Sequence, residues 1–188
     1  MRRVDFVVSP RKVSQRSLRR MKAADLRAQS SACNLPAMRP QDDPSWHAYG
    51  DTILEFLPGA DPVRVDLRKA VTEPLARMLA TRGLPGTFVV VTACNPRGHA
   101  ASDAENVVRT AVLRQTLDAR QLAWIPADGL SPDGTHREPG VAVAMSHGDA
   151  QALAREFEQS AIYRYDGEAF WLVGALVDAV PMRLPLLI

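Results

Sequence analysis

The run of residues 87–93 constrains the fold more than any other part of the sequence. It reads Thr-Phe-Val-Val-Val-Thr-Ala, so it is rich in β-branched residues and apolar on both faces of an extended chain. A strand with one solvent-exposed face alternates apolar and polar residues, whereas a strand covered on both faces is continuously apolar. We therefore expect residues 87–93 to form a central strand of a sheet.

The segments after this strand alternate between helix and strand signals. Ser102 and Glu105 have the spacing of a capping box and predict a helix that runs to about Arg120. Asp149 is the expected cap of a second helix, which extends through Gln159. Strands are expected at Leu122–Pro126, Val141–Met145, Ser160–Tyr165 and Phe170–Val173, with Asp166-Gly167 as a two-residue hairpin turn between the last two.

These elements follow the order β-α-β-β-α-β-β, which is the ferredoxin-like split βαβ order with one added strand. Ahead of them, a hairpin over Ile53–Leu57 and Val63–Leu67 and a helix that begins at Pro74 would extend the sheet. The sequence therefore predicts an α+β fold with a mixed, mainly antiparallel sheet and helices chiefly on one face. A doubly wound α/β sheet is the alternative, although the Asp-Gly turn requires antiparallel pairing and only one clear βαβ unit is present.

The charge distribution divides the chain into a basic arm and an acidic body. Residues 1–30 contain nine Arg and Lys and two Asp, a charge of +7, whereas the other residues contain 14 basic and 19 acidic side chains, a charge of −5. Pro36, Pro40 and Pro44 follow the arm and break regular structure. We expect residues 1–45 to be a basic arm and a Pro-rich linker, and residues 46–188 to form a single α+β domain, which is long enough to bury a core.

The basic arm, within which a helix over Arg11–Gln29 is expected, leaves several interpretations open. It is a segment without a partner, or the product of a start codon placed ahead of Met21 or Met38, or a site for a protein partner or a second copy of this chain. Nucleic acid is the less favoured partner. Because Phe6 is the only aromatic residue in the arm, any such contact would be to phosphate.

Several functional classes lack their sequence signals. No apolar run reaches the length of a membrane helix, and the N-terminus has no apolar core of a secretory signal, so a cytoplasmic protein without membrane contact is expected. Cys33 and Cys94 form neither a metal-binding pattern nor a disulfide framework, and the four histidines show no ligand spacing. P-loop, dinucleotide-binding and nucleophile-elbow motifs are missing. We therefore expect no metal and no cofactor.

The first group of candidate site residues surrounds the junction between the central strand and the following helix. Asn95 and Arg97 lie in the connecting loop, and the helix start contributes Ser102, Glu105 and Asn106. Free backbone N–H groups and the positive end of the helix dipole suit a phosphate or carboxylate there, and Arg97 could add a bidentate contact. The alternative is a structural connection in which Asn, Pro and Gly serve the turn and Ser102 and Glu105 serve the cap.

The second group lies in the polar segment Asp128–Gly140, which we expect to be a long loop. His136 and Glu138 are two residues apart, so their side chains share a face in an extended chain. A carboxylate that orients an imidazole would suit general acid–base catalysis. The alternative is a solvated loop in which Glu138 pairs with an arginine.

Several of these residues carry a resemblance to a known family. The stretch Phe88–Pro96, then Ser102 with Glu105-Asn106, Gly129, Glu138-Pro139 and Phe157–Ile162 resembles a bacterial family known as the domain of unknown function numbered thirty-two ninety-three. Tyr49 and Thr52 match an upstream tyrosine and threonine of that pattern. Glu158 departs from it by replacing a glycine, and Cys94 by replacing an aromatic residue. The resemblance covers roughly residues 46–175 and implies no established activity.

The resemblance implies that Asn95, Glu105, Asn106, Glu138 and Gln159 form one shared polar set. Polar groups that are buried or that line a cleft need partners, so the set is either a structural network or a ligand site. We expect a small-molecule binding or regulatory domain that holds an anionic or polar metabolite between the Asn95 loop and the Glu138 loop. A hydrolase-type enzyme that uses His136 and Glu138, and macromolecular binding through the arm, are the alternatives.

Overall fold

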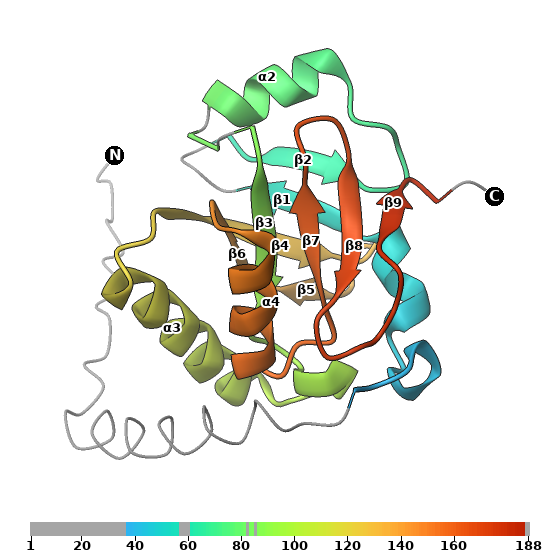
Figure 1. Cartoon of the computed structure of the whole chain (residues 1–188), viewed down its shortest axis with the longest axis vertical. Coiled ribbons are helices and arrows are strands. Elements are labelled where there is room, and N and C mark those ends of the chain that lie inside the picture. Colours follow the sequence, from blue (N-terminus) through green and yellow to red (C-terminus); the bar gives the residue numbers. More distant parts are fainter. Residues whose placement is uncertain (1–36, 57–60, 82, 85, 187–188) are drawn as a thin grey trace, which may run out of the picture. The chain divides into compact units, whose positions relative to one another are not determined.

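The computed structural model describes residues 37–56, 61–81, 83–84 and 86–186 (Figure 1). These residues belong to one compact unit that begins at Leu35. The basic arm, its expected helix over Arg11–Gln29 and the partner sites proposed for it lie outside the described residues, so they stay predictions. Within the expected linker, Met38 already makes a bridge to Val177, and Asp43 is buried.

The chain forms short 3₁₀ helices, three α-helices and nine strands in the described residues. The 3₁₀ helices are η1 (Pro40–Asp42), η2 (Trp46–Asp51) and η3 (Pro96–Gly98), and the α-helices are α2 (Glu73–Thr81), α3 (Asp103–Ala119) and α4 (His147–Glu156). The strands are β1 (Ile53–Phe56), β2 (Val63–Asp66), β3 (Phe88–Thr92), β4 (Trp124–Leu130), β5 (Arg137–Glu138), β6 (Gly140–Val143), β7 (Ala161–Tyr165), β8 (Phe170–Gly174) and β9 (Met182–Leu184).

The strands form a curled sheet, a half-barrel with the order β2-β1-β4-β6-β3-β7-β8-β9, and β5 pairs with β4 (Figure 1). All strand pairs of the described residues are antiparallel, and the parallel contact is the isolated bridge between Met38 and Val177. The predicted α+β class is confirmed, and the doubly wound alternative is wrong. The central position expected for residues 87–93 is confirmed, since β3 lies between β6 and β7 with Phe88–Val91 buried.

The ferredoxin-like assignment is not confirmed. The hairpin of β1 and β2 and the added strand β8 extend the sheet as expected, but together with β9 they give a curled half-barrel. The strand β9 carried no clear sequence signal, because only three residues take part in it. A right-handed twist accumulated over many antiparallel strands gives such a sheet its curvature.

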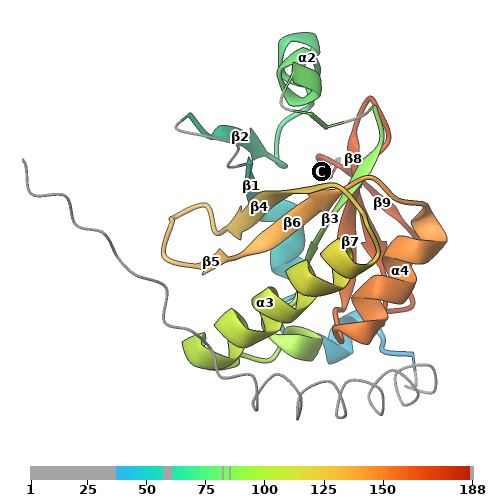
Figure 2. The ribbon, with the colours of Figure 1, turned by 90° about the vertical axis from the view of Figure 1, so that its left-hand side faces the viewer.

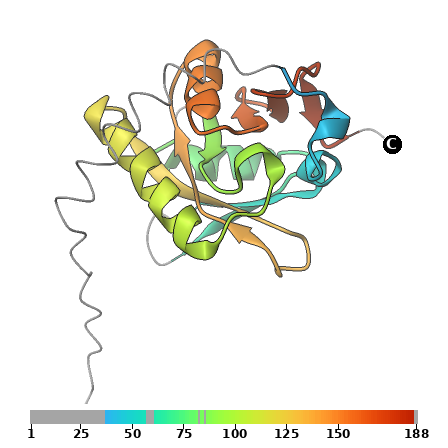
Figure 3. The same ribbon diagram turned by 90° about the horizontal axis from the view of Figure 1, so that it is seen from below.

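Two apolar clusters cover the two faces of the sheet. On one face α3 and α4 pack with Leu113, Leu117 and Leu153 against Val89 and Val91 of β3. Figures 2 and 3 show these two helices on one side of the sheet. On the other face Phe88 and Val90 meet the side chains of β1, β2 and β8, together with Leu79 of α2. The alternation of β3 between these clusters explains its continuous apolar sequence.

The segment Asp128–Gly140 is a hairpin and not the long loop expected from its composition. Residues up to Leu130 continue β4, and Arg137 and Glu138 form β5, which pairs with Leu130 and Gly129. The β5 and β6 pairings with β4 share one register, so the two strands are one extended segment interrupted at Pro139, which lacks an N–H. This hairpin projects from the sheet in Figures 2 and 3.

Two local expectations need correction. The cap of α4 is Ser146, whose side chain accepts from the Asp149 N–H and also lies 2.6 Å from the Asp149 carboxylate. The hairpin between β7 and β8 has a four-residue loop, because Tyr165 pairs with Phe170. The Asp166 side chain, which accepts from the backbone N–H groups of Glu168 and Ala169, stabilises this longer loop. The capping box of Ser102 and Glu105 is confirmed.

The close backbone approach after β8 gives a testable prediction. A Cβ atom at Gly174 would lie 2.0 Å from the Val177 carbonyl oxygen, so Gly174→Ala forces the backbone apart. We expect a loss of about 1–3 kcal/mol in the free energy of unfolding, measured by urea denaturation. Gly148→Ala is the matched control, because its Cβ would meet no atom within 4 Å and it lies in α4. A Gly174→Ala variant as stable as this control would contradict the close approach of the Val177 carbonyl oxygen to Gly174.

Candidate functional site

One end of the curled sheet gathers most of the polar residues singled out by the sequence. Because β3 runs antiparallel to both β6 and β7, the residues after β3 lie beside the residues that precede those two strands. Asn95 follows β3, Glu138 precedes β6 and Gln159 precedes β7. The end of β4 and the start of β1 lie at this same end, since Leu130 pairs with Ile53.

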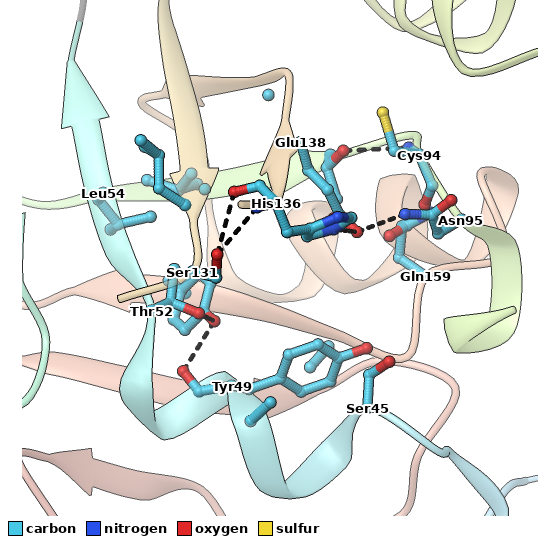
Figure 4. A pocket seen from close by; sticks show the side chains of 18 of the residues that line it. Ser45, Tyr49, Thr52, Leu54, Cys94, Asn95, Ser131, His136, Glu138 and Gln159 are labelled. Atoms are coloured by element: carbon cyan, nitrogen blue, oxygen red, sulfur yellow. Dashed lines mark hydrogen bonds and ion pairs between the residues drawn. The ribbon is translucent and has the colours of Figure 1, made fainter. Parts of the chain in front are cut away.

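A cavity of about 360 Å³ opens at this end of the sheet (Figure 4). Its apolar wall includes Leu54, Val90, Ala127 and Leu172 from the sheet. Its polar wall comes from loops and strand ends that are far apart in the sequence, and includes Tyr49, Asn95, His136, Glu138, Gln159 and Tyr163. Apolar cavities with a few convergent polar groups are the usual form of small-molecule sites.

Asn95 is held in one orientation by its neighbours. It adopts a left-handed conformation with φ 48°, which asparagine tolerates better than most residues. Its side-chain oxygen accepts from the Ala101 N–H at 3.0 Å and from Asn106 Nδ2 at 3.1 Å, and its own backbone N–H donates to Asn106 Oδ1. Since the oxygen is thereby fixed, the amide nitrogen is directed at Glu138 Oε1, 2.5 Å away.

The same carboxylate oxygen of Glu138 meets His136, with His136 Nε2 at 3.0 Å from Oε1. The turn before His136 is fixed by its own side chains, since Asp133 accepts hydrogen bonds from Ser131 and Thr135. These hydrogen bonds lower the pKa of Asp133 to about 2, so the turn carries a carboxylate at neutral pH. Figure 4 shows His136, Glu138 and Asn95 side by side along one wall of the cavity.

An ion-pair cluster on the opposite face of the hairpin holds β5 against the sheet. Arg137, between His136 and Glu138, contacts the buried carboxylates of Glu55 and Asp128, and Arg64 lies 2.6 Å from Glu55. Burial raises the pKa of Glu55, but the bonds from Arg64 and Arg137 outweigh it and leave this pKa below its usual value. Because neighbouring side chains of a strand point to opposite faces, fixing Arg137 on one face orients Glu138 toward the cavity.

Gln159 links the ends of β3 and α4. Its side-chain nitrogen donates to the carbonyl oxygens of Cys94 and Phe157 at 2.9 and 3.1 Å. Two carbonyl partners fix which end of the amide is the nitrogen. Gln159 is buried and lines the cavity. It is one of the residues that the family resemblance places in the shared polar set.

The wall across from Glu138 contains two half-buried tyrosines. The Tyr49 hydroxyl from η2 donates to Asp43 at 2.9 Å, and burial together with the Asp43 carboxylate raises the pKa of Tyr49 far above its usual value. The Tyr163 hydroxyl lies 2.7 Å from Thr52 Oγ1 and 2.9 Å from the Tyr49 carbonyl oxygen, and burial raises its pKa too. Both tyrosines therefore stay neutral hydrogen-bond donors.

Four residues predicted for the site do not line the cavity. Arg97 donates to Glu158 from its backbone and its Nε, at 2.8 and 3.1 Å, so it joins two loops. Ser102 and Glu105 are occupied by the helix cap. Asn106 lies behind Asn95 and orients it. His136, Glu138, Asn95 and Gln159, in contrast, are brought together at one cavity.

Other groups at this end of the sheet have structural explanations. Burial raises the pKa of the Cys94 thiol, and its sulfur lies 3.6 Å from Thr110 Oγ1, which is a packing environment.

Across the described residues, no group of three or more His, Cys, Asp and Glu side chains is placed to hold a metal ion. None of the helices in the described part of the chain is long and apolar enough to cross a membrane.

A family model described as "Protein of unknown function (DUF3293)" matches residues 91–162. The resemblance inferred from the sequence is thereby confirmed. The matched segment starts in β3 and ends in β7, so it includes Asn95, His136, Glu138 and Gln159. No curated protein and no solved structure matches the chain significantly.

The backbone at Glu158 accords with the glycine that the family resemblance implies at this position. Glu158 adopts a left-handed conformation with φ 55°. Glycine enters that region without strain. The Glu158 side chain forms an ion pair with Arg97.

Sequence reasoning missed Asp43, Ser45 and Tyr163 as neighbours of the cavity. Asp43 was assigned to the linker, and Ser45 and Tyr49 precede or form a 3₁₀ helix too short for a periodic signal. Tyr163 falls within the expected strand Ser160–Tyr165, in which no signal marks it as a cavity residue. The match of Tyr49 and Thr52 to the family pattern was the one signal for this wall.

The support of Asn95 by Asn106 gives a second prediction. Asn106→Ala removes one donor to the Asn95 side chain and one acceptor of its backbone N–H, so about 1–3 kcal/mol of stability is expected to be lost. Thermal unfolding followed by circular dichroism measures this loss. Gln115→Ala, at an exposed position of α3, is the matched control and should change stability by less than about 0.5 kcal/mol. Equal stability of the two variants would contradict the role assigned to Asn106.

Proposed function

We propose that this domain binds a small polar metabolite in the cavity at the end of the sheet. The observation that carries the proposal is the hydrogen-bonded series Asn106, Asn95, Glu138 and His136, which holds a carboxylate on the wall of an otherwise largely apolar cavity. Orienting one carboxylate from three separate chain segments costs conformational entropy. A ligand that meets a preorganised group binds more tightly, which supports a binding role.

A hydrolase-type enzyme is the second candidate, and one observation favours it. His136 and Glu138 line the cavity within 3.0 Å of each other, the arrangement expected of a general base and its orienting carboxylate. The His136 side chain is 59% exposed, so solvent reaches it. A regulatory binding domain needs no such pair, so conversion of the ligand distinguishes the two candidates.

A thermal-shift screen of the full chain tests the binding proposal. Neutral, cationic and anionic metabolites are each added, and a ligand at a hundredfold excess over its Kd stabilises the fold by about 2.7 kcal/mol. Glu138→Gln should abolish most of this stabilisation. The matched control is Glu105→Gln, because glutamine also serves a capping box and Glu105 does not line the cavity.

The outcomes of the screen separate the possibilities. Stabilisation that survives Glu138→Gln but is lost with a substitution elsewhere would contradict the proposed site, and the lack of any stabilising metabolite would contradict the proposed function. Each stabilising compound is then incubated with the protein and analysed by mass spectrometry. Conversion that requires both His136 and Glu138 would establish the enzyme. A ligand that stays chemically unchanged would favour the binding domain.

A further inference from the structure

We propose that the ligand of this cavity is a primary ammonium compound with a short aliphatic chain. The inference rests on the proposed function, because it names the chemical class that the same cavity selects. It replaces the anionic ligand that the sequence allowed for, since Arg97, the residue expected to bind an anion, is joined to Glu158 and does not line the cavity.

Five side chains of the cavity wall donate their hydrogen bonds to protein acceptors. Tyr49 donates to Asp43, Thr92 donates to the Pro139 carbonyl and Ser131 donates to Asp133. Tyr163 is within hydrogen-bond distance of the Tyr49 carbonyl and of Thr52, and the Gln159 nitrogen donates to two carbonyls. A ligand acceptor that binds to any of these five side chains would therefore have to break an existing hydrogen bond.

Two acceptors of the wall, by contrast, receive no hydrogen bond from the described residues. Asn95 and His136 both meet Oε1 of Glu138, which leaves Oε2 without a donor. The Gln159 oxygen is likewise without one, because the amide nitrogen faces the two carbonyls. Each carboxylate or amide oxygen accepts two hydrogen bonds, so both residues need a donor from a ligand or from water. An ammonium group supplies three.

The charge of the cavity wall also favours a cationic ligand. Among the described residues that line the cavity there is no Arg or Lys, whereas Glu138 and Asp51 are present. Burial is the main cause of the raised pKa values of Tyr49, Tyr163 and Cys94, and the negative charge of Glu138 raises all three further. A negative potential that reaches three different parts of the wall attracts a cation and repels an anion.

The rest of the ligand is set by the apolar wall. Leu54, Val90 and Leu172 are almost fully buried and line the cavity together with Ala127. The volume of about 360 Å³ is at the small end of ligand sites. A short aliphatic chain buries its surface there without leaving a polar group unpaired.

Three compounds that share one chain test the inference on the full-length protein. Pentylamine, pentan-1-ol and pentanoate differ in the head group, which is an ammonium, a neutral hydroxyl and a carboxylate at pH 7.5. Their dissociation constants are measured by protein-observed NMR titration. Because charge-assisted hydrogen bonds are about twice as strong as neutral ones, pentylamine is expected to bind about tenfold more tightly than pentan-1-ol. Pentanoate is expected to bind most weakly.

A pair of variants assigns the preference to the cavity. Glu138→Gln should reduce the preference for pentylamine over pentan-1-ol to about threefold or less, while Glu105→Gln keeps it unchanged. Pentanoate or pentan-1-ol that binds as tightly as pentylamine would overturn the inference and leave the proposed function standing. A preference for pentylamine that persists in Glu138→Gln would likewise overturn the inference and leave the proposed function standing. Failure of all three compounds to bind would also overturn it, and the metabolite screen then decides the proposed function separately.

Discussion

The antiparallel pairing of β3 with both of its neighbours is the constraint on which the site depends. In an antiparallel sheet the end of one strand lies beside the start of the next, so the segments after β3, before β6 and before β7 meet at one edge. Asn95 stands three residues after β3, and Glu138 and Gln159 stand two residues before β6 and β7. With parallel neighbours, the residues preceding β6 and β7 would lie at the opposite end of β3.

The curvature of the sheet turns this edge into a cavity. The strands β1 and β4 bend around the apolar cluster of Phe88 and Val90, and η2 brings Tyr49 across from Glu138. The two faces of the hairpin strand β5 then have separate roles. Arg137 ties the outer face to buried carboxylates, and Glu138 is exposed to the cavity on the inner face. The ion-pair cluster of Arg137 thus positions the Glu138 carboxylate, whose Oε2 receives no hydrogen bond from the described residues.

Much of this arrangement was predictable because its signals are local. The β-branched run of β3 and the capping box of α3 each report their structure within a few residues, and both are confirmed. The proximity of Asn95 and Glu138 was expected from two polar segments at strand ends, and their side chains lie 2.5 Å apart. The direction of Arg97 and the burial of Asp43 were not predictable, since they depend on partners far away in the sequence. The hairpin within Asp128–Gly140 was hidden by Gly129 and Pro139, which are poor strand residues.

The binding site is tested most directly by a chemical-shift map of the full-length protein titrated with pentylamine. We expect the amide signals that move most to belong to the ends of β3 and β4 and to residues around Glu138 and Gln159, which line the cavity. The exposed helix α2, which lies outside the lining, should stay unchanged. Shifts concentrated in α2, or in residues 1–36, with the cavity unaffected, would contradict the claim that this cavity is the binding site.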